Sequence, residues 1–163
     1  MSEQIDKMNF FITEFAQDRP GDDIKILLNQ GEKFSNDDLL SMATQAFMGL
    51  YSSGGNNPEN KHGVLPTNNR NSLIVYSNVA DDTVRMLCIV TEKEKVNTYL
   101  KVLNDEKIHD AIVALRVLMS NNEFDAVAAN ILFKQLNLLL EERMNQEKNK
   151  DKDVERINQV FGS

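Results

Sequence analysis

The chain has 163 residues, no tryptophan and a formal net charge of −7 at pH 7. A chain of this length can bury a single core without disulfides or a structural metal. Its net negative charge is concentrated in residues 1–60, and an acidic chain is poorly suited to gripping a phosphate backbone, which needs clustered Lys and Arg. We therefore expect a protein as partner, or a second copy of this chain, and no direct binding to nucleic acid.

Cys88 is the only cysteine, so no disulfide can form within the chain and nothing indicates an oxidising compartment. The first residues show no basic segment followed by an apolar run, and no stretch approaches about eighteen apolar residues. These features predict a cytoplasmic protein that does not insert into membranes. The frequent Asn, Lys and Ile favour a bacterial or phage origin.

In chain order, apolar residues recur at helical spacing from Ile5 to Phe15, which predicts an opening helix over 2–16 that Pro20 and Gly21 end. The short apolar run over 24–28, bounded by Asp and Asn, predicts a strand. Ser35 then precedes a second helical pattern that continues to about residue 52, and its hydroxyl can cap the first turn of that helix.

Residues 53–71 show no periodicity and are rich in Asn, Pro and Gly, which predicts a long loop. Its composition also favours disorder. Alternating apolar residues over 73–79 and 83–91 predict an antiparallel hairpin with a turn at residues 80–82. The second of these strands is apolar on both faces and should be central in a small sheet, with 24–28 as the third strand.

Three helical patterns follow, over about 92–103, 104–119 and 122–144. The short connection at 120–122 predicts that the last two helices form an antiparallel hairpin. The last one is apolar over a wide arc, because two neighbouring rows of apolar residues run along it. We expect both rows to be covered, either by the rest of the chain or by a partner.

After Met144 the chain becomes charged, with alternating signs, before Val154, Ile157 and Phe161 recur at helical spacing. This segment is either a solvated continuation of the helix or a flexible linker. We predict one α+β domain over 1–147, with a small, mostly antiparallel sheet of about three strands packed against helices. Residues 148–163 would be a charged linker and a short amphipathic tail.

No residue pattern predicts catalysis. His62 and His109 lack metal-ligand spacing with other donors, and the sequence contains no nucleophile elbow, phosphate-binding loop or dinucleotide fingerprint. The paired aspartates fall where turns and helix starts favour Asp. We therefore expect no cofactor, no metal and no enzymatic activity.

The leading hypothesis is a small acidic protein-binding module, such as an adaptor, a chaperone-like subunit or a regulator, that acts through its C-terminal helices. Homodimerisation through the helical hairpin would account for the same features. The candidate contact residues are apolar and belong to the last helix and the tail: Leu136, Leu140, Met144, Val154, Ile157 and Phe161.

Two alternatives belong to other functional classes. The first is a small-ligand-binding or enzymatic domain that uses Lys61, His62 and Arg70 of the 53–71 loop for an anion. The second is an acidic inhibitor, or nucleic-acid mimic, that occupies a basic site on a partner. Its candidate acidic face comprises Asp22, Asp23, Asp37 and Asp38.

Overall fold

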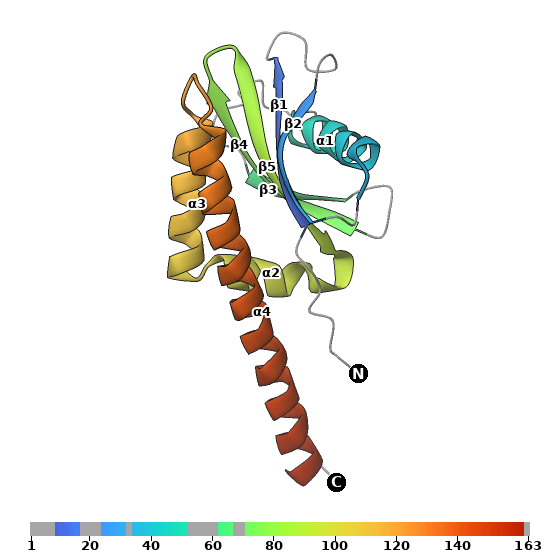
Figure 1. The fold of residues 1–163 in the computed structure, drawn as a ribbon. Coiled ribbons are helices and arrows are strands. Elements are labelled where there is room, and N and C mark those ends of the chain that lie inside the picture. The colour runs from blue at the N-terminus through green and yellow to red at the C-terminus, as the bar shows by residue number, and fades with distance from the viewer. Residues whose placement is uncertain (1–8, 17–23, 32–33, 52–61, 67–70, 162–163) are drawn as a thin grey trace.

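The computed structural model describes residues 9–16, 24–31, 34–51, 62–66 and 71–161. The strands are β1 (Asn9–Ala16), β2 (Lys25–Gln30), β3 (His62–Pro66), β4 (Asn71–Ala80) and β5 (Thr83–Glu92). The helices are α1 (Asn36–Tyr51), the short 3₁₀ turn η1 (Lys93–Lys95), α2 (Val96–Leu103), α3 (Glu106–Met119) and α4 (Ala126–Phe161). Figure 1 shows α1 on one side of the sheet and α3 and α4 on the other.

The predicted α+β class is confirmed, with an antiparallel sheet packed against helices and a C-terminal helical hairpin formed by α3 and α4. In the described residues the sheet has five strands in the order β2-β1-β5-β4-β3, not about three. β5 is the central strand, as its two apolar faces predicted. The strand predicted over 24–28 is present as β2, but it pairs with β1 rather than with the hairpin.

The predicted opening helix is wrong over its described part, because residues 9–16 form strand β1 between β2 and β5. Phe10 and Ile12 face the helical layer of α2, α3 and α4, while Phe11 and Phe15 face α1, and all four are buried. Burial of adjacent residues on opposite faces is typical of a central strand. The helical spacing of Phe11, Ile12 and Phe15 was therefore coincidental, and sheet pairing decided the conformation.

The prediction that residues 53–71 form one long loop is also partly wrong. His62–Pro66 forms β3, an edge strand that pairs with β4. The signal for β3 was weak because only Val64 and Leu65 are clearly apolar in it. Pro66 can occupy this strand because an edge strand does not need every backbone N–H for pairing.

The predicted hairpin is confirmed as β4 and β5, joined by Asp81 and Asp82. Asp81 has a positive φ of 57°, a conformation that Asp tolerates better than most residues in tight turns. The predicted alternation of side chains between the two faces of these strands is also confirmed. One row of β4 and β5 packs on α1, and the other packs on the helical layer of α2, α3 and α4.

Two apolar cores therefore lie on opposite faces of the sheet. The core on the α1 side contains Leu39, Met42, Ala43 and Ala46. The amide of Asp38 donates to the Ser35 hydroxyl (3.2 Å), so the predicted cap of α1 is present. The larger core lies beneath α2, α3 and α4.

Helix α4 is continuous from Ala126 to Phe161, so residues 148–161 are helical in backbone. Its C-terminal part projects away from the sheet and from the other helices (Figure 1). Of the two interpretations of the charged segment, this arrangement corresponds to a helical continuation. Among the described residues, no helix combines the length and the apolar character needed to cross a membrane.

Candidate functional site

The inner row of α4 attaches this helix to the sheet. Phe133, Leu136 and Leu140 are essentially fully buried, and the Phe133 ring meets Phe10 of β1 edge to face, with 4.4 Å between ring centroids. Leu136 and Leu140 were expected to contact a partner, but they belong to the protein's own core. Met144, the third of these candidates, is partly buried and packs against the same core.

The outer row of α4 is exposed. Val127, Ile131 and Leu138 keep 75%, 63% and 66% of their surface accessible. They are spaced i, i+4 and i+11, so they lie within roughly 40° of one another around the helix. The described chain therefore leaves this row uncovered, and the expectation that a partner covers it stays a prediction.

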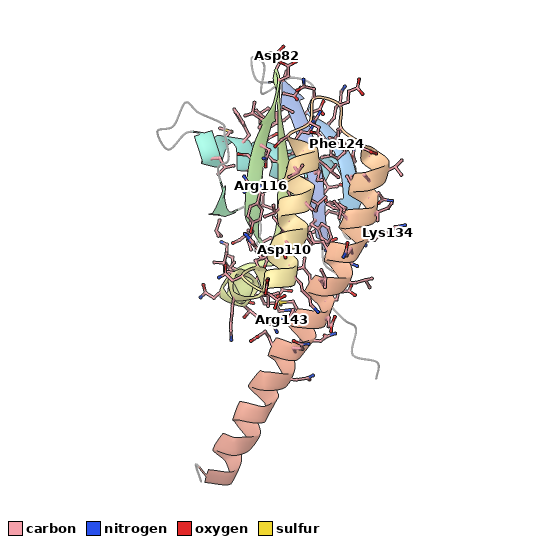
Figure 2. The ribbon with its side chains drawn as sticks, turned by 90° about the vertical axis from the view of Figure 1, so that its left-hand side faces the viewer. Asp82, Asp110, Arg116, Phe124, Lys134 and Arg143 are labelled. Atoms are coloured by element: carbon pink, nitrogen blue, oxygen red, sulfur yellow. The ribbon has the colours of Figure 1, made fainter. Side chains whose placement is uncertain are left out.

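Helix α3 exposes apolar residues in the same way. Val113 and Val117, one turn apart, are 45% and 58% exposed, whereas Ile108, Ile112 and Leu115 of the same helix are buried. Figure 2 shows α3 and α4 side by side. Because both helices turn their buried sides to the same sheet, their exposed rows share the side that faces away from it. We call Val113, Val117, Val127, Ile131 and Leu138 the outer apolar face.

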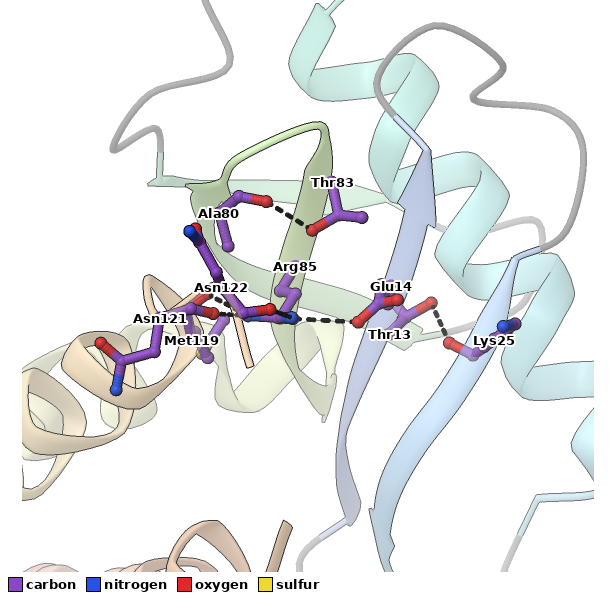
Figure 3. A network of polar contacts seen from close by, with 9 residues as sticks. All are labelled: Thr13, Glu14, Lys25, Ala80, Thr83, Arg85, Met119, Asn121 and Asn122. Atoms are coloured by element: carbon purple, nitrogen blue, oxygen red, sulfur yellow. Dashed lines mark hydrogen bonds and ion pairs between the residues drawn. The ribbon is translucent and has the colours of Figure 1, made fainter. Parts of the chain in front are cut away.

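Arg85 of β5 fixes the turn between α3 and α4. Its guanidinium is buried beside the turn, where Nε donates to the Glu14 carboxylate (3.0 Å) and Nη1 donates to the Met119 carbonyl (3.0 Å). It also donates to the carbonyls of Asn121 and Asn122 (Figure 3). A single side chain thus satisfies carbonyls at the end of α3 and in the turn, and it ties them to the centre of the sheet.

A second polar contact holds α3 on β4. Arg116 donates from Nε to the Asn78 side chain (2.7 Å) and from Nη2 to the Ser77 carbonyl (3.0 Å), and its guanidinium lies 5.5 Å from the Tyr76 ring centroid. Figure 2 shows Arg116 on the side of α3 toward β4, while Asp110 is labelled farther along α3. Burial raises the pKa of Tyr76, and the nearby positive charge of Arg116 opposes that rise.

Ion pairs hold α4 where it leaves the sheet. Arg143 lies 3.4 Å from Asp105 and 3.3 Å from Glu147, and Lys101 of α2 lies 3.1 Å from Glu147. Glu147 is only 5% exposed, and a buried charge is costly unless it is paired. The position of α4, and therefore of its outer row, is fixed at both ends of the hairpin.

The remaining tail candidates lie in the last part of α4. Val154, Ile157 and Phe161 are helical in backbone, and their side chains are outside the described part of the structure. Their role in partner contact stays a prediction.

The residues of the two alternative sites are mostly outside the described ranges. Lys61, Arg70, Asp22 and Asp23 lie outside the described residues, and His62 begins β3 with its side chain outside the described part. Asp37 and Asp38 lie exposed in the first turn of α1, on the opposite side of the sheet from α3 and α4 (Figure 1). Both alternatives therefore remain predictions.

In the part of the chain that the structure describes, cysteine, histidine and acidic residues do not gather into a metal site. Cys88 is fully buried in β5, and burial raises the pKa of its thiol, which disfavours the reactive thiolate. His109 is exposed on α3. Within the described ranges, no group of three or more His, Cys, Asp or Glu residues could hold a metal ion.

No family model, curated protein or solved structure matches the chain. Among the described residues, the most distinctive surface feature is the outer apolar face.

The sequence predicted the apolar rows that form this face, but not their exposure. Val127, Ile131 and Leu138 form one of the two apolar rows predicted for the last helix, and Val113 and Val117 widen the apolar stripe of the preceding helix. The sequence did not show which row the sheet would cover. Lys134 lies in the exposed row between Ile131 and Leu138, and a lysine in that row indicates that the row faces solvent.

Proposed function

We propose that this chain is a protein-binding module, an adaptor, chaperone-like subunit or regulator, that acts through surface contact rather than catalysis. The observation that carries the proposal is the outer apolar face of α3 and α4. We further propose that it acts in the cytoplasm, in keeping with its single cysteine.

The arrangement of the outer apolar face supports binding rather than chance exposure. Isolated exposed apolar residues are normal on protein surfaces. Here five of them lie on two adjacent helices, on the same side of the helical layer, and each is at least 45% exposed. Apolar residues gathered on one surface and rimmed by polar residues are typical of protein interaction sites.

The contacts that hold α3 and α4 on the sheet also support this function. Buried residues and polar contacts on the inner side of α3 and α4 hold the two helices on the sheet, so the outer residues are presented on a rigid support. Preorganised surfaces lose less conformational entropy on binding. The projecting part of α4, which carries Val154, Ile157 and Phe161, is a second place for contact with the same partner.

Site-specific photo-cross-linking tests the proposal. A photoreactive amino acid replaces Leu138 in the full-length chain, which is expressed in the cells that make this protein. We expect a discrete cross-linked product that contains a second protein molecule, identified by mass spectrometry. The same amino acid at Met48, which is 59% exposed on α1 across the sheet, is the matched control and should give no such product.

Substitution of Val127, Ile131 and Leu138 by Gln in a chain that carries the cross-linker at Val117 should abolish the product. Gln has a high helix propensity, so these substitutions at exposed positions leave α4 intact. Equal cross-linking from positions 138 and 48, or no product from either of them, would contradict the proposed function.

A further inference from the structure

The outer apolar face carries a strong charge bias. Six carboxylates and two basic residues border it on α3, α4 and the turn between them. The carboxylates are those of Glu106, Asp110, Glu123, Asp125, Glu141 and Glu142, and the basic residues are Lys107 and Lys134. The surroundings of the face are therefore acidic.

These carboxylates are available to a partner. In the part of the chain that the structure describes, none of the six forms an ion pair with Lys or Arg. Five of them are exposed and Glu141 is half-buried. Asp125 accepts a hydrogen bond from the Ala128 amide at the start of α4, which leaves its negative charge uncompensated by any base. Charge complementarity thus favours a positively charged partner.

The same charges argue against a second copy of this chain. Two identical faces packed together would bring mostly carboxylates opposite carboxylates, and like charges opposed across an interface are unfavourable. Lys107 and Lys134 are too few to compensate six acidic groups on each copy. The occupant should instead supply the missing basic residues.

The helical backbone beneath the face indicates the secondary structure of the partner segment. The exposed rows lie on helices, whose central N–H and C=O groups are already bonded within the helix and cannot pair with an added strand. A second helix can pack across such rows with its own apolar stripe at i, i+3, i+4 and i+7. From Val127 to Leu138 the longer row covers eleven helical steps, or about 16.5 Å at 1.5 Å per residue, which is close to three helical turns.

We propose that the outer apolar face binds an amphipathic helix of another protein, about three turns long, with Lys or Arg residues on both sides of its apolar stripe. This inference rests on the proposed function and names the chemistry of the partner. The apolar stripe supplies affinity, and the basic flanks select this face over uncharged apolar surfaces.

A peptide-display selection tests the inference. The library uses a helical frame of about 18 residues, long enough to form a helix, with a fixed Leu and Ala stripe. Its flanking positions are randomised among Lys, Glu, Gln and Ser. The full-length chain is the bait, and a chain with Val127, Ile131 and Leu138 replaced by Gln is used for counter-selection. We expect the enriched peptides to carry Lys at the flanks.

Two variants separate the apolar contribution from the electrostatic one. Binding of an enriched peptide should weaken by at least about tenfold on the triple Gln chain, because the three substitutions remove apolar surface that the peptide would bury. Charge reversal by Asp110→Lys and Glu142→Lys should weaken it by roughly tenfold and reduce its dependence on salt. Circular dichroism verifies that each variant remains folded.

Failure of the inference and failure of the proposed function give different results. Enrichment of Glu, or of no charge type, would overturn the inference while leaving a protein-binding face. Light scattering that shows a dimer of the full chain, lost in the triple Gln chain, would assign the face to a second copy and also overturn it. No enriched peptide, together with a monomeric chain and no cross-linked product, would overturn both.

Discussion

The two rows of α4 contain the same kinds of residue and have opposite environments. Leu136 and Leu138 are two positions apart, roughly 200° around the helix. The first is completely buried, and the second is 66% exposed. The inner row meets β1 and the core of the helical layer, whereas the outer row belongs to neither core and stays mostly exposed.

This difference separates stability from recognition within one helix. Burial of a leucine side chain contributes about 1.5–3 kcal/mol to folding, whereas an exposed leucine contributes little. The outer leucine therefore has no strong structural reason to be apolar. Burial accounts for the inner row, whereas the proposed contact with a partner would account for the outer row.

The largest expected effect concerns the contacts that hold both rows in place. Arg85→Ala leaves Glu14 without its partner and removes the donors to three backbone carbonyls. Breaking a buried charge network of this kind should reduce the free energy of unfolding by about 3–5 kcal/mol, measured by urea denaturation. Lys134→Ala, an exposed basic residue of α4, is the control and should change it by less than about 0.5 kcal/mol.

The comparison of the two rows is tested directly by a pair of leucine substitutions. Leu136→Ala creates a cavity in the core and should cost about 2–5 kcal/mol. Leu138→Ala should change stability by less than about 0.5 kcal/mol, because its side chain is already in water. Similar losses in the two variants, measured by denaturant unfolding, would show that the outer row is also part of the folded core.

The sheet core on the α1 side gives a pH-dependent test of burial. The pKa of the Cys88 thiol is raised by burial, whereas in the unfolded chain it should be about 8.5. The stability that comes from burying the neutral thiol is complete below that pH. It is lost as pH rises toward the folded-state pKa, by up to about 1.4 kcal/mol per pH unit.

A chain with Cys88→Ala should lack this part of the pH dependence. The difference in unfolding free energy between the two chains, measured from pH 8 to about pH 10.5, isolates the thiol from other titrating groups. A constant difference across that range would show that the thiol is accessible to water in the folded state.

The smallest expected effect lies at the exposed start of α1. Ser35→Ala removes the acceptor of the Asp38 amide and should cost about 1 kcal/mol. Ser41→Ala, an exposed serine inside the same helix, is the matched control and should be neutral or slightly stabilising, since Ala has the higher helix propensity. Thermal unfolding followed by circular dichroism compares the two variants, and equal melting temperatures would rule out the cap.

Local patterns in the sequence predicted the elements whose neighbours are close in the chain. The β4–β5 hairpin, the cap of α1 and the α3–α4 hairpin depend on turns, alternation and short connections, all of which are visible in the sequence. The error at β1 has a different origin. Its pairing with β5 joins residues far apart in the chain, and tertiary contacts of this kind override local periodicity.

The candidate site was predicted only in part for a related reason. The sequence showed two apolar rows on the last helix, and the structure covers the row with Leu136 and Leu140 rather than both rows. Which row is covered depends on where the helix meets the sheet, and that sheet includes a strand that the sequence did not predict. The contact between Phe10 of β1 and Phe133 of α4 turns the inner row toward the sheet and leaves the outer row on the surface.

The most direct test of the central claim uses the chain with Val127, Ile131 and Leu138 replaced by Gln and measures two properties of it. We predict an unfolding free energy within about 1 kcal/mol of the original chain and loss of the cross-link from position 117. A loss of several kcal/mol in unfolding free energy would show that the outer row is part of the folded core. Unchanged stability with unchanged cross-linking would show that Val127, Ile131 and Leu138 contribute nothing to partner binding, which would contradict the account.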